Sequence, residues 1–194
     1  MSLLDRFLPQ ADVRKRHEIT IHAPAAFVYR VVQEFDIESV AGVHALFWLR
    51  GKMLGARAEP KPRSGFIAYM RSIGWGCLTE EPGHYYVAGA ACRPWEADVV
   101  FYPVAPEDFA GYSEPDEVVI AWTLECEATG PEITRFVTET RAEGTDTQAR
   151  EKFRTYWRRF GIGIELIRRL LLPAIRREAE TRWKSAKAAT AVQP

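Results

Sequence analysis

The segment 84–95, HYYVAGAACRPW, places small side chains where a strand normally carries large ones. Strands favour β-branched and aromatic residues, which fill a pleated, half-buried surface. If Tyr86, Ala88 and Ala90 face inward, they leave room inside the protein. Either a bound molecule or a bulky neighbour such as Trp122 occupies that room, because apolar pockets hold small ligands and protein cores pack densely.

Arg93 and Trp95 end the same segment and offer a polar rim. A guanidinium at a strand end can bind a carboxylate or phosphate through two parallel hydrogen bonds, with the indole of Trp95 as a wall beside it. An ion pair between Arg93 and Glu96 or Asp98 is the simpler interpretation, and it is preferred. Trp95 and Tyr102 are predicted to lie at the mouth of a pocket.

His44, in GVHALFW, is a candidate for proton exchange, since an imidazole titrates near neutral pH. A single histidine on a helix is more often packed or solvent-exposed, and this interpretation is preferred. An enzyme would use His44, Arg93 and Tyr102 as polar catalysts in one pocket. The sequence contains no G-x-S-x-G, P-loop or G-x-G-x-x-G motif and shows no set of nucleophile, base and orienting group.

Cysteine and histidine spacing argues against a metal site. The chain has three cysteines and four dispersed histidines, and no C-x-x-C pair. We therefore expect no metal and no cofactor, and free thiols in a reducing, cytoplasmic compartment. Residues 1–18 carry charges throughout, unlike a secretory signal, and no apolar run is long enough to span a bilayer.

Acidic and basic residues balance overall but not along the chain. Lys plus Arg and Asp plus Glu number 26 each, so no net field favours nucleic acid as a partner. Residues 96–146 contain thirteen acidic and two basic side chains, whereas residues 147–194 contain four acidic and twelve basic ones. An acidic sheet region and a basic helix either attract each other or form separate solvated faces. The basic helix could also contact an anionic membrane or a partner, but packing on its own sheet is preferred.

The first half of the chain predicts a strand followed by two helices. Residues 18–22 alternate polar and apolar side chains, and Pro24 suits the first turn of the helix that follows. A second helical pattern covers 38–54, and a loop with Pro and Gly covers 55–65. Residues 65–92 read as strands broken by glycine.

Further strands are predicted at 97–104, 117–127 and 132–143. In the second of these, the face that carries Trp122 is expected to pack, and the face that carries Glu125 to be wetter. The last strand places Thr138 and Arg141 on opposite faces. Arg135 or Arg141 is expected to form a surface ion pair with Glu125 or Glu127 of the neighbouring strand, which stabilises little.

A helical segment closes the chain. Asp146 or Thr147 can cap its start, an aromatic stripe follows, and the helical pattern runs to about residue 187. The glycines at 161–163 should break or bend the helix. Pro173 implies a kink or a restart, because proline removes one backbone hydrogen bond.

This order of elements predicts an α+β fold, with two short helices after the first strand and a long C-terminal helix on an antiparallel sheet. One face of the sheet must be covered by the last helix, because only that helix carries enough aromatic surface. Residues 1–188 are expected to form one domain, and 189–194 a frayed tail.

The same order, opened by ITIHAPAAFVYRVV, resembles the helix-grip (SRPBCC) superfamily, which includes START lipid-transfer domains, the birch pollen allergen and polyketide cyclases. The phrases LLDRFLPQADVRKRHEITIHAP, TEEPG, RPW, PEDF, TETR and FRTYWRRFGIGIELIRRLLLPAIRREAE resemble more narrowly an uncharacterised bacterial group within it. The resemblance covers nearly the whole chain. It implies a curved antiparallel sheet wrapped around the C-terminal helix, with a hydrophobic cavity between them. This fold hosts carriers, sensors and enzymes alike.

The resemblance and the small-residue strand together predict a binding or carrier protein for a small hydrophobic molecule that is lipid-like, isoprenoid or aromatic. The alternative is an enzyme of the polyketide cyclase or dehydratase kind that uses the same cavity. Polarity inside the cavity separates the two, because an enzyme needs a titratable group beside its substrate. The predicted lining residues are Tyr86, Ala88, Ala90, Trp122, Thr138 and Tyr156, with Trp95 and Tyr102 at the mouth.

Overall fold

A computed structural model describes residues 2–55 and 65–191, except the side chains at positions 38, 41, 44, 47, 48, 50, 51, 54 and 191. In this part of the chain, six strands form one antiparallel sheet in the order β1-β6-β5-β3-β2, with β4 paired to β3. The strands are β1 (Val13–Ile21), β2 (Gly76–Glu81), β3 (Tyr85–Cys92), β4 (Phe101–Tyr102), β5 (Val118–Gly130) and β6 (Ile133–Gly144). The helices are α1 (Ala25–Glu34), α2 (Ala41–Leu54), α3 (Phe66–Ser72) and α4 (Thr147–Ala191), with short 3-10 helices η1 (Leu3–Arg6), η2 (Ile37–Ser39) and η3 (Phe109–Gly111).

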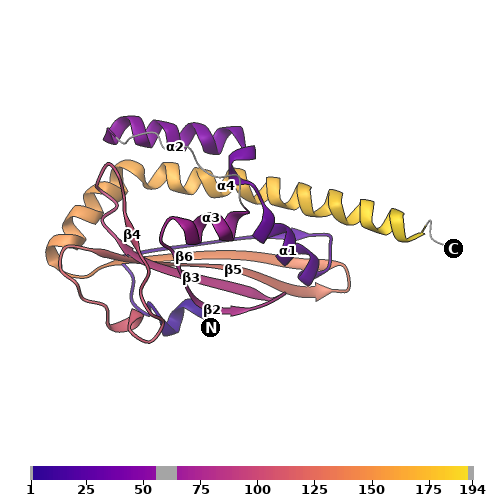
Figure 1. Ribbon diagram of the computed structural model, residues 1–194, viewed down its shortest axis with the longest axis horizontal. Coiled ribbons are helices and arrows are strands. Elements are labelled where there is room, and N and C mark those ends of the chain that lie inside the picture. The colour runs from indigo at the N-terminus through magenta and orange to yellow at the C-terminus, as the bar shows by residue number, and fades with distance from the viewer. Residues whose placement is uncertain (1, 56–64, 192–194) are drawn as a thin grey trace.

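The helices α1, α3 and α4 lie on one side of the sheet, and α2 packs outside α4 (Figure 1). We call the sheet face toward these helices the inner face and the opposite one the outer face. An antiparallel sheet with a long C-terminal helix across one face is the helix-grip arrangement. The predicted fold class is therefore confirmed.

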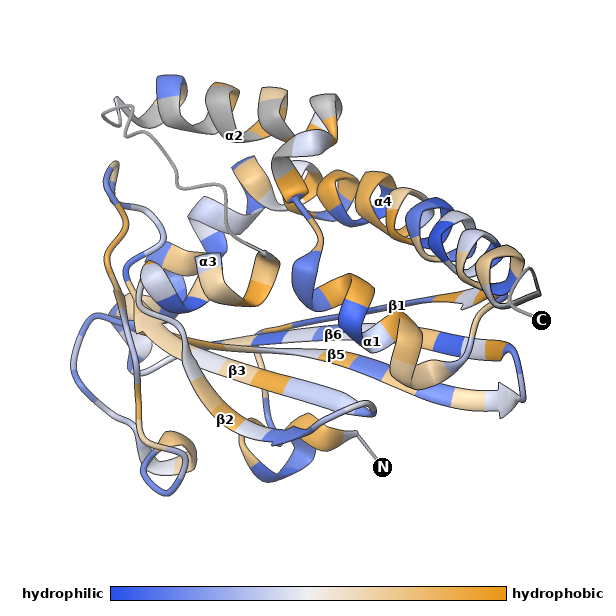
Figure 2. Ribbon diagram, turned by 45° about the vertical axis from the view of Figure 1, so that its right-hand side comes forward, coloured by the Kyte–Doolittle hydropathy of each residue, from blue (hydrophilic) through white to orange (hydrophobic). Residues whose placement is uncertain are grey.

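The helix α3 corrects the prediction that residues 65–92 form only strands. Phe66 and Ile67 pack into the core of the inner face, and Figure 2 shows α3 over the sheet with hydrophobic residues in its first turn. Gly74 follows the helix with a φ of +105°, and a Cβ there would lie 2.1 Å from the carbonyl oxygen of Phe101. The position therefore requires glycine. Glycine and aromatic residues in one short segment are typical of a strand, which explains the wrong prediction.

The outer face of β5 is buried, which corrects the prediction of a wetter face. The side chain of Thr123 is fully buried, and Glu125 is only 8% exposed. A second hydrophobic cluster covers this face, and several of its members precede β1 or lie between β4 and β5. Its buried members are Leu4, Phe7, Leu8, Leu78, Val87, Ala91, Val104, Phe109, Val119 and Ala121. Both faces of the central strands are thus packed.

Arg141 lies in this outer layer and not at the surface, so the alternative in which it forms the surface ion pair is wrong. Its side chain is 1% exposed and donates hydrogen bonds to Glu139 (2.6 Å), to Asp5 (2.7 Å) and to a backbone carbonyl (2.7 Å). The other predicted alternative, an exposed pair between Arg135 and Glu127, is confirmed, with 2.9 Å from Nε to the carboxylate. Arg141 thereby ties the segment before β1 to the sheet.

The helix α4 continues through both of its predicted interruptions. The backbone remains helical across the glycines at 161–163 and across Pro173. Figure 1 shows a pronounced bend in the orange, N-terminal part of α4, so the prediction of a bend, and not that of a break, describes this helix. Asp146 caps the helix, because its Oδ1 accepts a hydrogen bond of 2.7 Å from the backbone N–H of Ala149.

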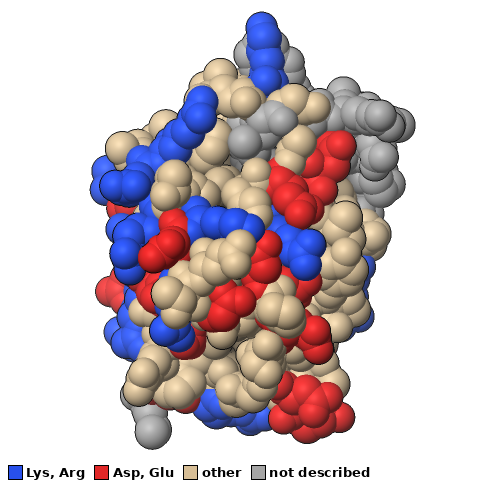
Figure 3. All heavy atoms as spheres, turned by 90° about the vertical axis from the view of Figure 1, so that its left-hand side faces the viewer, with Lys and Arg blue, Asp and Glu red and all other residues tan. Residues whose placement is uncertain are grey.

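The acidic region 96–146 and the basic segment 147–194 contact each other. Ion pairs join α4 to the acidic region at Arg150–Glu143 (3.0 Å), Lys152–Asp116 (2.7 Å) and Lys187–Glu132 (2.7 Å). Figure 3 faces the end of the molecule where α4 bends and shows basic and acidic side chains intermingled there. Of the two predicted outcomes, mutual attraction is the one that the structure contains.

Candidate binding site on the inner face

The small residues of β3 face the helices, and aromatic rings lie beside them. Ala88 pairs with Trp122 of β5, and Tyr86 pairs with Leu124. The side chains of Ala88 and Ala90 are fully buried in the main hydrophobic core. Because directly opposite residues of antiparallel strands point to the same face, the indole of Trp122 takes up room that the alanines leave.

The rings around Trp122 form a group that we call the inner aromatic cluster. The centroid of the Trp122 ring lies 5.3 Å from that of Phe66, 5.8 Å from that of Trp75 and 5.8 Å from that of Tyr86. Phe101 adds a fifth ring, 4.9 Å from Trp75. Aromatic pairs at these separations stabilise each other beyond the area that they bury.

Two polar atoms of the inner aromatic cluster lack partners. The Nε1 atoms of Trp75 and Trp122 are buried, and neither donates a hydrogen bond to any described residue. A buried donor without an acceptor is unfavourable by about 1–3 kcal/mol, so most such groups in proteins find a partner. The cluster is therefore apolar in its faces but able to bind an acceptor atom at its edges.

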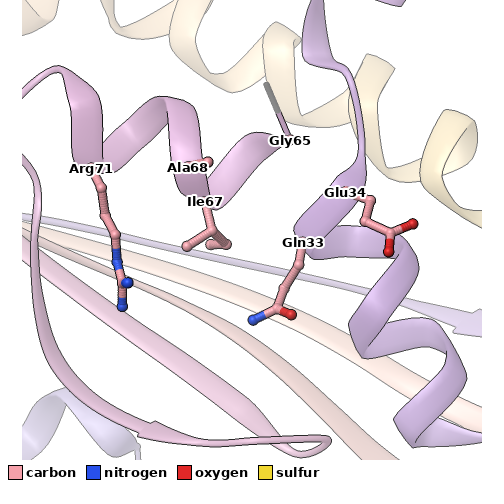
Figure 4. Close-up of a pocket in the computed structure, with 6 residues that line it drawn as sticks. All are labelled: Gln33, Glu34, Gly65, Ile67, Ala68 and Arg71. Atoms are coloured by element: carbon pink, nitrogen blue, oxygen red, sulfur yellow. The ribbon is translucent and has the colours of Figure 1, made fainter. Parts of the chain in front are cut away.

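An open hollow of about 460 Å³ lies between α1 and α3, beside the cluster. Its lining residues are Gln33, Glu34, Gly65, Ile67, Ala68 and Arg71. Figure 4 shows Gln33 and Arg71 pointing toward the sheet on either side of Ile67, while Glu34 points away. Ile67 is buried in the same core as Trp122. The wall of the hollow at Ile67 thus belongs to the same core as the inner aromatic cluster.

Two polar lining residues of the hollow, Gln33 and Arg71, belong to a network of hydrogen bonds. The carboxylate of Glu80 accepts hydrogen bonds from the hydroxyl of Tyr29 (2.7 Å) and from Gln33 (3.3 Å). Arg71 donates from Nε to the hydroxyl of Tyr86 (3.1 Å) and lies 3.9 Å from Glu80. Burial and the bond to Glu80 raise the pKa of Tyr29, and burial raises that of Tyr86 although Arg71 opposes it. Both phenols are therefore neutral at physiological pH and can donate hydrogen bonds.

A second polar group lies on the inner face under α4. Arg168 donates from Nη1 to the hydroxyl of Thr138 (3.3 Å) and from Nη2 to that of Thr140. Thr140 pairs with Trp122, and Thr138 pairs with His17 of β1. Burial lowers the pKa of Arg168 to about 10, so the guanidinium stays charged. The sequence offers no signal for Arg168, which is one of twelve basic residues in the C-terminal segment.

The structure brings the predicted lining residues into two groups. Tyr86, Ala88, Ala90 and Trp122 lie together in the main core, and Thr138 lies near them under α4. Tyr156 and Trp95 lie in a separate cluster with the first turns of α4. Their roles in binding remain predictions.

The three candidate catalytic residues lie in different surroundings. Arg93 donates to a backbone carbonyl and lies 3.8 Å from both Glu96 and Glu117, as the ion-pair interpretation expected. Tyr102 pairs with Ala91 of the outer-face cluster and is 50% exposed. The side chain of His44, on α2, lies outside the described residues.

Sequence reasoning missed several residues around the hollow. Trp75 and Ile67 were not predicted as site residues, because the segment around them was interpreted as strand. Glu80 was interpreted as a solvated turn residue, and only the contact with Tyr29 of α1 reveals another role. In the described part of the chain, no three His, Cys, Asp or Glu residues lie together as metal ligands. No helix among the described residues has the length and apolar character needed to cross a membrane.

Comparison with known proteins finds distant structural similarity. No family model and no curated protein matches the sequence. The structure of DR_A0006 from Deinococcus radiodurans is 16% identical, with 78% of this chain and 99% of that chain covered and a TM-score of 0.30. That of TTHA0849 from Thermus thermophilus is 14% identical, with 88% and 99% covered and a TM-score of 0.33. The Zhui aromatase/cyclase from Streptomyces sp. R1128 is 18% identical, with 88% and 94% covered and a TM-score of 0.28. Similarity at this level says nothing of ligand or activity.

Proposed function

We propose that the protein binds or carries a small, predominantly apolar molecule of lipid-like, isoprenoid or aromatic type, held between the inner face of the sheet and the helices. The observation that carries this proposal is the hollow between α1 and α3, whose lining residue Ile67 is buried in the same core as the inner aromatic cluster. A volume of about 460 Å³ lies within the range of small-molecule sites.

Burial of apolar surface supplies the affinity. Each Å² removed from water contributes roughly 25 cal/mol, so a ligand that buries roughly 300 Å² gains about 7.5 kcal/mol before the cost of association. Arg71 and Gln33 line the hollow and supply the few polar contacts that orient a ligand.

A cyclase or dehydratase in the same site is the second candidate, because the titratable group of Glu80 contacts two lining residues of the hollow, Gln33 and Arg71. A binding protein is preferred. The Glu80 carboxylate is already held by Tyr29 and Gln33, and the proposed catalysts Arg93 and Tyr102 lie elsewhere. Conversion of a polyketide-like substrate by the purified protein, followed by mass spectrometry, would favour the enzyme if Glu80→Gln abolished it.

Filling the hollow tests the binding function. Ala68 is exposed and lines the hollow, so Ala68→Trp should fill it without disturbing the core. Ala189→Trp, at an exposed position near the end of α4, is the matched control. We expect the wild type and the control to bind the neutral hydrophobic dye Nile red, and Ala68→Trp to bind it at least about tenfold more weakly, which is about 1.4 kcal/mol. Equal binding by all three proteins would rule out this hollow as the ligand site.

A further inference from the structure

The inner and outer faces of the sheet each hold one arginine that lies largely inside the protein. Arg141, on the outer face, is bound by two carboxylates and a backbone carbonyl. Arg168, on the inner face, is bound by two threonine hydroxyls, which carry no charge. Within the described residues, no carboxylate lies within ion-pair distance of the Arg168 guanidinium. A cation inside a protein is normally paired with an anion, because desolvation disfavours an isolated charge.

The groups around Arg168 do not neutralise it. Glu165, one turn earlier on α4, acts on Arg168 at longer range, but its carboxylate is bound by Lys15 (2.9 Å) and lies 3.5 Å from Arg169. His17 faces the same region from β1, since it pairs with Thr138. Burial and the charge of Arg168 both lower the pKa of His17, so its imidazole is neutral and adds no negative charge. The region therefore carries an excess of positive charge.

Hydrogen-bond donors are also in excess here. A guanidinium has five N–H donors. Among the described residues, two N–H groups of Arg168 donate to protein acceptors. Trp122 lies directly across from Thr140, which Arg168 contacts, and its buried indole N–H has no acceptor among the described residues. Unused donors beside an uncompensated cation match an oxyanion, and the planar fork of arginine matches a carboxylate in particular.

We propose that Arg168 binds the carboxylate of the ligand, with the Trp122 indole N–H as a second donor, so that the protein selects amphipathic carboxylic acids. This inference rests on the proposed function, because the apolar body of the acid would lie against the inner aromatic cluster. Trp122 connects the cluster with the surroundings of Arg168, since its ring contacts Phe66 of α3 and it pairs with Thr140, which Arg168 contacts under α4.

The test compares an acid with its neutral analogue. Decanoate and decanamide share one alkyl chain and differ in head-group charge. Each is titrated against the protein loaded with Nile red, and displacement is measured for the wild type, Arg168→Gln and Arg169→Gln. Arg169 is the matched control, because it is the next residue of α4 and is largely exposed, with its side chain 70% accessible.

We expect the wild type and Arg169→Gln to bind decanoate about 10- to 100-fold more tightly than decanamide. In Arg168→Gln this preference should disappear, while the affinity for decanamide stays within about twofold. Equal affinity of the wild type for both compounds, or a preference that survives in Arg168→Gln, would overturn the inference and leave the binding function standing. Failure of the wild type to bind the dye and both compounds would overturn the proposed function itself. If Arg168→Gln fails to fold, the affinities of the wild type for decanoate and decanamide still test the inference.

Discussion

Replacing Arg141 and Arg168 separately by methionine distinguishes an arginine that holds the fold together from one kept for binding. Methionine is unbranched and apolar and fits where an arginine stem packs. Both positions contact the same strand, since Arg141 lies on β6 and Arg168 contacts Thr138 and Thr140 of β6. The two substitutions remove the same charge from opposite faces of one sheet.

Arg141→Met should destabilise the protein strongly. The change leaves Glu139, whose side chain is 3% exposed, without its 2.6 Å partner, and it removes the link to Asp5. Breaking a buried ion pair by removing one partner typically costs about 3–5 kcal/mol. Ser2 and Arg16 still donate to Glu139 at 2.8 and 3.1 Å, so we expect the lower end of that range, about 3 kcal/mol.

Arg168→Met should leave the free energy of unfolding nearly unchanged. The lost hydrogen bonds from the charged guanidinium to two hydroxyls are worth about 1.5–3 kcal/mol each. Removing a desolvated, unpaired charge stabilises the folded protein by a similar free energy or more, because burying such a charge costs several kcal/mol. We therefore expect a change within about 1 kcal/mol of the wild type, in either direction.

Urea unfolding followed by tryptophan fluorescence measures both changes, since the chain has six tryptophans. Arg135→Met, at the exposed pair with Glu127 on the same strand, is the control and should cost less than about 1 kcal/mol. If Arg168→Met lowered the free energy of unfolding as much as Arg141→Met, the reasoning would be refuted. Such a result would show that contacts within the protein are enough to stabilise the charge of Arg168.

Three further predictions concern the core, the thiols and pH. Gly89→Ala would place a Cβ 2.3 Å from the ring of Phe109, so it should lower the free energy of unfolding by about 1–3 kcal/mol in urea denaturation. Burial raises the pKa of the Cys126 thiol to about 12, so a thiol-reactive dye should label half-buried Cys77 in the native protein and Cys126 only after unfolding. Burial alone would raise the pKa of Glu139, but hydrogen bonds from an arginine and a serine hold it below its usual 4.5. Its stabilisation should therefore be complete above pH 4.5 and lost as the pH falls through its folded pKa, which urea unfolding at several pH values would show.

Local patterns were sufficient to predict much of the fold. Alternation along β5 and β6 correctly assigned the inner faces, and the cap at Asp146 marked the start of α4. The outer face of β5 was predicted wrongly because the residues that cover it, such as Leu4 and Phe109, lie far from it in the chain or in a loop. Burial by distant segments leaves no trace in the period of a single strand.

The candidate site shows the same limit in its polar residues. Ala88 and Ala90 were predicted from their size, which is a property of the residues themselves. Arg141 and Arg168 look alike in the sequence, as basic residues near other charges. In the described part of the chain, however, Arg141 is bound by two carboxylates, whereas Arg168 donates only to hydroxyls. What distinguishes them is which acidic side chains the fold brings within reach, and that depends on contacts such as Asp5 with Arg141, across more than half of the chain. The size of a side chain is therefore known from the sequence, whereas the pairing of a charge is known only from the fold. The unpaired charge of Arg168 is the feature on which we base the inference of a carboxylate ligand.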